Sequence, residues 1–294
     1  MSIDEAKRRA RALHEEALAL SAAGEVNRAL RCYLEALALD PRNAAAYSNV
    51  GLIYKNRGDW AKALRYTRRA VELAPHDKAS LWNLAIAATA LRDWATARHT
   101  WARLGFDIDP AGGDIETNLG LTPVRLNPAS HPEVVWARRI DPVRARIVSI
   151  PYPSSGFRHA DVVLHDAAPE GSRLLLDQEL SVFNVFELFQ ASRFSTFEAR
   201  LQAGESDDIA ALEEICENFD VELEDWSATV RSLCHECSTG SQDPAHAERH
   251  PPQDTRERII GLAGDNPGAV REVLHRWQGG DRRVLSFRLA LAPP

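Results

Sequence analysis

The sequence has few cysteines, a single methionine and no long hydrophobic run. Its four cysteines, spread over 294 residues, are too sparse for the disulfide framework of a small secreted protein. No apolar stretch approaches the about eighteen residues of a membrane-spanning helix, and the start MSIDEAKRRARALHEE is charged where a signal peptide is apolar. We therefore expect a bacterial-type cytoplasmic protein without a membrane partner.

Lysine is also scarce, and the charge is unevenly distributed along the chain. All four lysines lie before residue 79, so Schiff-base chemistry is unavailable to the rest. Residues 1–111 carry 17 Lys and Arg against 13 Asp and Glu, whereas residues 112–294 carry 18 against 29, which argues against a nucleic acid partner. Residues 201–230 contain ten acidic residues and no basic one. Such a run is typical of a solvated helix face, and the alternative is a docking surface for a basic protein.

The first third of the chain repeats itself. Shifting the sequence by 34 residues superimposes several identical residues, among them Asn49 on Asn83, Trp60 on Trp94, Gly24 on Gly58 and Pro41 on Pro75. A period of this length, in segments whose apolar residues have helical spacing, predicts repeated pairs of helices. Alanines 29, 63 and 97 recur where the two helices of a pair must approach closely.

These residues resemble the tetratricopeptide repeat. The second unit carries residues at the family's signature places: Tyr47, Gly51, Tyr54, Ala63, Ala70 and Pro75. The resemblance covers about residues 5–111 as three units and implies an α-solenoid. The first unit departs from the pattern at Glu16 and Ala17, which suits a capping repeat, and the third departs from it at Leu104 and Pro110.

The resemblance implies a concave groove that binds a peptide or a partner protein. Carried over position by position, this groove presents His14, Leu18, Ser48, Leu52, Lys55, Trp82, Ile86 and Thr89. It is apolar, and it lacks the lysines and asparagines with which chaperone-binding members hold a C-terminal carboxylate. Either a partner or the protein's own following domain must cover such an apolar surface, and both alternatives remain open.

Residues 112–190 are predicted to be a linker followed by a small β-rich module. Short runs of β-forming residues at 133–140, 143–150, 161–166, 172–176 and 180–189 predict an antiparallel barrel or sandwich, with turns at Asp141-Pro142 and at residues 169–171. Residues 111–133 are rich in Gly, Pro and Asn and are predicted to be a connection. His159, Asp161, His165 and Asp166 are ligand types at short spacing, but neighbours on a strand face opposite sides, so we expect ordinary polar surface.

The last third, residues 191–294, shows the order strand, helix, strand twice. The strands are predicted at 196–203, 221–226, 258–263 and 282–291, the last with Leu285, Phe287, Leu289 and Leu291 on one face. The helices are predicted at about 206–220 and at 267–277, the second with Asn266 as its cap and Pro267 at its first position. The order β-α-β-β-α-β is that of a ferredoxin-like sandwich.

An insertion at 232–255 in this domain contains two cysteines and three histidines. Cys234 and Cys237 form one close pair, and His246 and His250 form another, a set that predicts a closed structural zinc site. His235 is an alternative ligand for either histidine position. The loop has almost no apolar residues to order it without a metal. A redox dithiol and free thiols without metal are the alternatives, and no H-E-x-x-H helix points to catalytic zinc.

Taken together, the sequence predicts a multidomain α + (α+β) protein. Its parts are helical repeats at 1–111, the linker and β-rich module at 112–190, and the zinc-binding ferredoxin-like domain at 191–294. We expect a non-catalytic protein-protein interaction adaptor or chaperone-like scaffold. One alternative is an enzyme or enzyme accessory subunit with a site in residues 129–294, and another is an immunity-type protein that neutralises a basic toxin.

Overall fold

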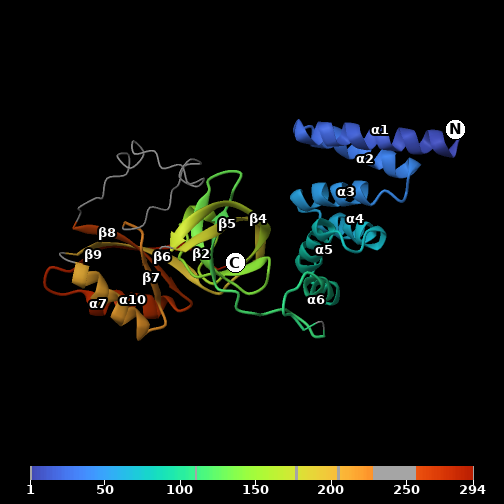
Figure 1. Ribbon diagram of the computed structural model, residues 1–294. Helices are drawn as coiled ribbons and strands as arrows, with labels where there is room; N and C mark the ends of the chain where they lie inside the picture. The colour runs from blue at the N-terminus through green and yellow to red at the C-terminus, as the bar shows by residue number, and fades with distance from the viewer. Residues whose placement is uncertain (1, 110, 176–177, 204–205, 228–255, 294) are drawn as a thin grey trace. The chain divides into compact units, whose positions relative to one another are not determined.

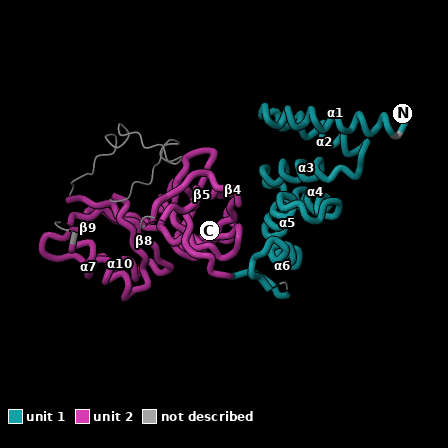
Figure 2. The backbone as a smooth tube through the Cα atoms, viewed as in Figure 1, with its two compact units in different colours: residues 1–116 teal, residues 117–294 magenta. Residues whose placement is uncertain are grey.

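A computed structural model describes residues 2–109, 111–175, 178–203, 206–227 and 256–293. The chain divides into two compact units, residues 1–116 and residues 117–294 (Figure 2). The first unit is helical, and the described part of the second consists of strands, two α-helices and a short 3₁₀ helix at Pro153–Ser155.

The first unit is built from three successive helix pairs (Figure 1). Within each pair the helices pack closely because the facing side chain is small: Ala29, Ala63 and Ala97 are fully buried. A Cβ atom on Gly51 would lie 2.5 Å from the Thr67 methyl group, so the second pair also requires glycine. The pairs are α1 (Ile3–Ala22) with α2 (Val26–Leu39), α3 (Ala44–Asn56) with α4 (Trp60–Leu73), and α5 (Lys78–Ala90) with α6 (Trp94–Arg103).

Residues that recur every 34 positions set the helix ends. The side chains of Asn43 and Asp77 cap α3 and α5 by accepting a backbone N–H three residues further on, at 3.0 Å in both cases. Between the helices of a pair the chain adopts a left-handed conformation, at Gly24 with φ +77° and at Gly58 with φ +69°. The third pair has Arg92 at this place, with φ 57°. The repeat is therefore encoded by local backbone chemistry as well as by apolar spacing.

The first part of the second unit is a closed five-stranded barrel. Sequential antiparallel pairing joins the strands, and β1 pairs with β5 in parallel because five alternating strands leave the first and last running the same way. The interior is apolar, with Leu126, Ile147 and Val163 fully buried. The strands are β1 (Leu121–Leu126), β2 (Glu133–Arg139), β3 (Arg144–Ile147), β4 (Val162–Leu175) and β5 (Gln178–Gln190).

Two details of the predicted β-rich module are wrong. Residues 121–126 were expected in a connection but form β1, because the strand is completed by partners on both sides that local composition does not reveal. The runs at 161–166 and 172–176 are not two strands separated by a hairpin at 169–171. Both runs belong to the single strand β4. Its pairing with β5 changes register on either side of Pro169, so the strand continues through residues that were expected to form a turn. The predicted turn at Asp141-Pro142 does connect β2 to β3.

The second part of this unit is a four-stranded antiparallel sheet with strand order β7-β8-β6-β9. Helices α7 and α10 pack on it around a core that includes Leu212, Val273 and Trp277 (Figure 1). The Asn266 side chain caps α10 by accepting the Gly268 N–H at 2.9 Å, as predicted. The elements are β6 (Ser195–Gln202), α7 (Ser206–Glu217), β7 (Glu222–Asp225), β8 (Glu257–Gly264), α10 (Pro267–Trp277) and β9 (Arg283–Leu291).

The predicted apolar face of the last strand is only partly correct. Phe287 packs against the core, but Leu285 and Leu289 are 46% and 53% exposed. β9 lies at the edge of the sheet, and its register against β6 shifts twice, which breaks the strict alternation that the prediction assumed. The sheet therefore leaves leucines accessible along one edge.

Trp226 joins the barrel to the sheet. Its indole N–H donates a hydrogen bond to the Ile150 carbonyl oxygen at 2.9 Å. A Cβ atom on Gly261 would lie 2.4 Å from the indole ring, so glycine is needed beneath it. The Ile150 N–H in turn donates to the Glu224 carboxylate at 2.6 Å. Within the described part of the chain, no helix has the length and apolarity required to cross a membrane.

Candidate functional site

Two leucines at equivalent repeat positions form the accessible apolar part of the predicted groove. Leu18 in α1 is 46% exposed, and Leu52 in α3, 34 residues later, is 37% exposed. Both leucines, at the same position of successive repeats, are therefore accessible to solvent.

The side chains around these leucines are held in place. The His14 ring packs edge-on against Tyr33 at a centroid distance of 5.4 Å. Burial lowers the pKa of His14, partly opposed by Glu15, so the ring is neutral at pH 7. The Ser80 and Ser48 hydroxyls are hydrogen-bonded to each other at 2.9 Å, which links α3 to α5.

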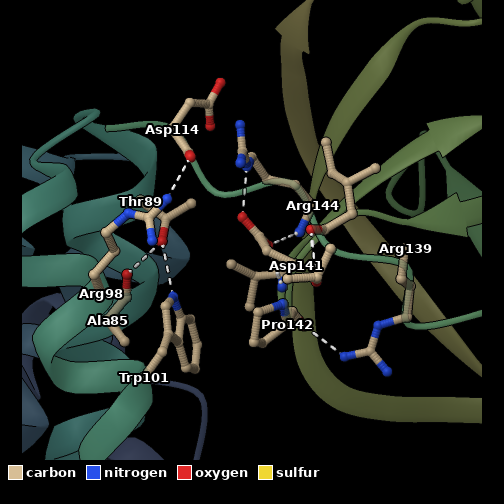
Figure 3. A network of polar contacts seen from close by, with 12 residues as sticks. Ala85, Thr89, Arg98, Trp101, Asp114, Arg139, Asp141, Pro142 and Arg144 are labelled. Carbon is tan, nitrogen blue, oxygen red and sulfur yellow. Dashed lines mark hydrogen bonds and ion pairs between the residues drawn. The ribbon is translucent and has the colours of Figure 1, made fainter. Parts of the chain in front are cut away.

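The third repeat presents its predicted groove positions differently. Ile86, which is equivalent to Leu52, is only 1% exposed, and Thr89 is fully buried. The Thr89 hydroxyl donates to the Ala85 carbonyl oxygen at 2.8 Å and accepts the Trp101 indole N–H at 3.2 Å (Figure 3). Lys55 is also buried, at 5% exposure. These three residues are part of the folded interior and do not offer a free surface.

The chain that follows α6 packs back onto the third repeat. Phe106 makes edge-to-face contacts with Trp82 at 5.7 Å and with Trp101 at 5.6 Å. The Arg98 guanidinium donates to the carbonyl oxygens of Asp109 and Asp114, each at 2.6 Å, and so fixes the segment beyond (Figure 3). Trp82, predicted to line the groove, is therefore half-buried under the protein's own chain.

The four ligand-type residues in the barrel do not gather around a common point. Asp161 is fully buried and accepts backbone N–H groups from Arg158 at 2.8 Å and from Ser192 at 2.7 Å. His159 contacts the Val148 carbonyl oxygen at 3.2 Å. His165 is fully buried, whereas Asp166 is half-buried and bonds its own neighbouring backbone. These side chains stabilise turns and the barrel wall.

The predicted zinc ligands Cys234, Cys237, His246 and His250, and the alternative ligand His235, lie outside the described residues. In the part of the chain that the structure describes, no group of three His, Cys, Asp or Glu side chains is placed to hold a metal ion. Burial raises the pKa of the Cys216 thiol to about 12, with Glu213 and Glu222 adding to the effect, so this thiol is unreactive at neutral pH.

One surface feature of the first unit was missed by the sequence reasoning. A hollow of about 760 Å³ lies between the second helices of the first two repeats, α2 and α4. Leu34, Leu37 and Leu64 contribute its apolar lining, and Arg65 and Arg69 stand among the residues that surround it. The arginines along α4 could have indicated a basic helix face. Their spacing does not reveal which other helix packs beside α4, and the hollow depends on that neighbour.

The second unit has smaller, charged hollows. One of about 550 Å³ is lined by Asp208, Arg256, Asp281 and Arg282, of which Arg282 and Asp208 approach to 4.0 Å. Another, of about 420 Å³, is acidic and surrounds Cys216. Neither brings together a nucleophile, a base and an anion-stabilising group in the way an acyl- or phosphoryl-transfer site requires.

Comparison with known proteins identifies the repeats. Residues 17–58 match a family model described as a TPR repeat, and residues 44–77 match one described as a tetratricopeptide repeat. The tetratricopeptide resemblance predicted from the sequence is thereby confirmed for the N-terminal region. No curated protein matches the chain.

Several solved structures are similar to the helical part. The first TPR of Spaghetti (RPAP3) bound to the HSP90 peptide SRMEEVD is 22% identical, with 33% of this chain and 78% of that chain covered and a TM-score of 0.32. The Arabidopsis OM64 TPR domain is 17% identical, with 33% and 81% covered and a TM-score of 0.31. Yeast Tom70 is 26% identical, with 34% and 20% covered and a TM-score of 0.32.

Proposed function

We propose, from the tetratricopeptide repeats at residues 17–77, that the chain is a non-catalytic protein-interaction adaptor or chaperone-like scaffold. Its ligand would be an apolar segment of a partner protein bound over the first two repeats. The observation that carries the proposal is the pair of exposed leucines, Leu18 and Leu52, at the same position of successive repeats.

The chemistry of this surface favours apolar over charged ligands. Lys55 is buried, so a carboxylate at the end of a peptide would find no accessible lysine there. Leu18 and Leu52 are 46% and 37% exposed, so covering the rest of each contributes under half of the about 1.5–3 kcal/mol for burying a whole leucine side chain. A micromolar affinity corresponds to about 8 kcal/mol, so further contacts with the partner must supply most of it.

A capture experiment with matched variants tests this proposal. The whole chain, Leu18→Glu, Leu52→Glu and Leu91→Glu would be used as baits, and bound proteins would be identified by mass spectrometry. Leu91 is the control because it is 43% exposed but lies at the end of α5, outside the two repeats that form the site. A partner retained by the unaltered chain and by Leu91→Glu, but lost from the other two, would support the proposal. Equal retention by all four would contradict it.

For the C-terminal domain we propose a ferredoxin-like sandwich stabilised by structural zinc. The antiparallel strand order β7-β8-β6-β9 with two helices supports the fold assignment. The spacing of Cys234, Cys237, His246 and His250 supports zinc. Metal analysis of the purified protein should find about one zinc per chain and much less in Cys234→Ser. Absence of zinc from the unaltered protein would exclude the site.

The acidic surface of this domain supports a basic protein as a second partner. Glu213, Glu214 and Glu217 are exposed on α7, and Glu213 and Glu217 line the acidic hollow. Binding of a basic partner here would weaken as ionic strength rises. It would also weaken in a variant with all three glutamates changed to glutamine, while binding at Leu18 and Leu52 would be unaffected.

A further inference from the structure

The hollow between α2 and α4 combines an apolar floor with a positively charged edge. Leu34, Tyr47, Leu64 and Tyr66 are half-buried, so each leaves part of its apolar surface facing this hollow. At about 760 Å³ it has the size of a ligand site. Ala38 of α2 and Ala61 of α4, both exposed, also line the hollow.

The charges around the hollow are predominantly basic. Its lining includes three arginines, Arg65, Arg68 and Arg69, and one glutamate, Glu72. Arg65 forms no ion pair with any described residue: its guanidinium lies over the Tyr66 ring at 4.9 Å and donates to the Tyr66 hydroxyl at 3.2 Å. Arg65 is exposed, so its positive charge is available to a ligand.

Two neighbouring arginines have carboxylate partners, but those pairs are exposed. Arg68 contacts Asp93 at 3.2 Å, and Arg69 contacts Glu72 at 2.8 Å. Exposed pairs of this kind contribute little to stability and exchange readily for another carboxylate. Three guanidinium groups can therefore turn toward carboxylates that enter the hollow.

We propose that this hollow is a second protein-binding site, which takes an acidic peptide segment of a partner protein. One or two aliphatic or aromatic side chains of the segment would cover the leucines and tyrosines, and its carboxylates would pair with Arg65, Arg68 and Arg69. The charge of the edge selects an acidic occupant over a basic or neutral one. Apart from Tyr47 of α3, the residues that line the hollow lie on the second helices, and neither Leu18 nor Leu52 is among them, so the proposal does not depend on the function proposed above.

Binding of three labelled synthetic peptides tests the proposal by fluorescence anisotropy. The first contains glutamate, leucine and tryptophan, the second replaces glutamate by lysine, and the third replaces leucine and tryptophan by serine. The first should bind the whole chain most tightly, and its binding alone should depend on the hollow. Its affinity should fall at least about tenfold in Arg65→Glu, because a charge-assisted contact becomes repulsive. Ala61→Trp, which fills the hollow without changing its charge, should cause a similar loss.

Two control variants test whether the first peptide binds in the hollow itself. Arg31→Glu makes the same charge change on α2 outside the hollow, and Leu52→Glu alters the first-helix surface; neither should affect the first peptide. Circular dichroism would confirm that each variant is folded. Equal losses in Arg31→Glu and Arg65→Glu would mean diffuse electrostatic attraction and would overturn the proposal. A loss confined to Leu52→Glu would assign the peptide to the other surface, with the same consequence.

A second copy of this chain is the other possible occupant of the hollow, and sedimentation velocity tests for it by measuring self-association. Self-association that Arg65→Glu abolishes would mean that the acidic segment of another copy fills the hollow, and the partner proposal would be wrong. A monomer that binds the first peptide supports it. Failure of the unaltered chain to bind any of the three peptides would also refute it.

Discussion

The buried histidine of the barrel should make the stability of the second unit depend on pH. His165 on β4 is fully buried, and its Nδ1 atom lies 2.7 Å from the Asp166 carbonyl oxygen. The ring packs against Phe183 at 5.2 Å, and Nε2 has no hydrogen-bond partner among the described residues. Burial lowers the pKa of His165 to about 4; the Asp166 carbonyl opposes this change and Arg139 adds to it.

The sign of the effect follows from the two pKa values. In the unfolded chain His165 has the ordinary pKa of 6.5 and gains a proton below that pH, whereas in the folded chain it stays neutral until about pH 4. The contribution to stability is therefore complete above pH 6.5 and is lost as the pH falls toward 4. Each pH unit in this window costs about 1.4 kcal/mol, so the loss reaches about 2 kcal/mol at pH 5 and about 3 kcal/mol at pH 4.

Urea unfolding of the unaltered chain and of His165→Phe, at about pH 7 and about pH 5, measures this contribution. Phenylalanine keeps the apolar packing against Phe183 and removes the titrating group. We expect the variant to lose about 2 kcal/mol less than the unaltered chain between these pH values. Effects of other groups, including His14, cancel in the comparison because both chains contain them. An equal loss in both chains would refute the argument that His165 is buried in its neutral form.

The other predictions concern close packing and a buried ion pair. Gly51→Ala should destabilise the helical unit by about 1–3 kcal/mol, because its Cβ would lie 2.5 Å from the Thr67 methyl group. Adding Thr67→Ser removes that methyl group and should recover most of the loss in thermal unfolding; no recovery would show that the contact is not the cause. Asp141→Asn should cost about 3–5 kcal/mol in urea unfolding, because it removes the carboxylate that lies 2.6 Å from the buried Arg144 guanidinium (Figure 3). Arg68→Gln, which breaks an exposed ion pair, should cost much less, and similar losses in both variants would contradict this reasoning.

Features with a local cause were predictable from the sequence. The 34-residue period includes residues that determine the local backbone conformation. Asn43 and Asp77 cap helices, and Gly24 and Gly58 adopt the left-handed conformation between helices. Helix α10 could also be predicted from the sequence, because its cap, its first-turn proline and its apolar face all lie within twelve positions of one another. Each of these signals needs no knowledge of what packs nearby.

Features that depend on distant partners were not predictable. Leu52 and Ile86 occupy the same repeat position, yet one is exposed and the other is buried among residues brought together by the fold. β1 was predicted to be a connection because its two flanking strands come from later parts of the chain. Leu289 is exposed because β9 is the edge of a sheet whose order only folding establishes.

The sequence by itself therefore determined the repeat family, the position of helix α10 and the order of strands and helices in the described part of the last domain. The tertiary structure decided which of the repeated positions remain accessible, and it created the hollow between α2 and α4. The physical reason is that caps, turns and helical periodicity act over a few residues, whereas exposure depends on neighbours that are remote in sequence. Leu18, Leu52 and Arg65 carry the proposed functions because the fold leaves these side chains uncovered.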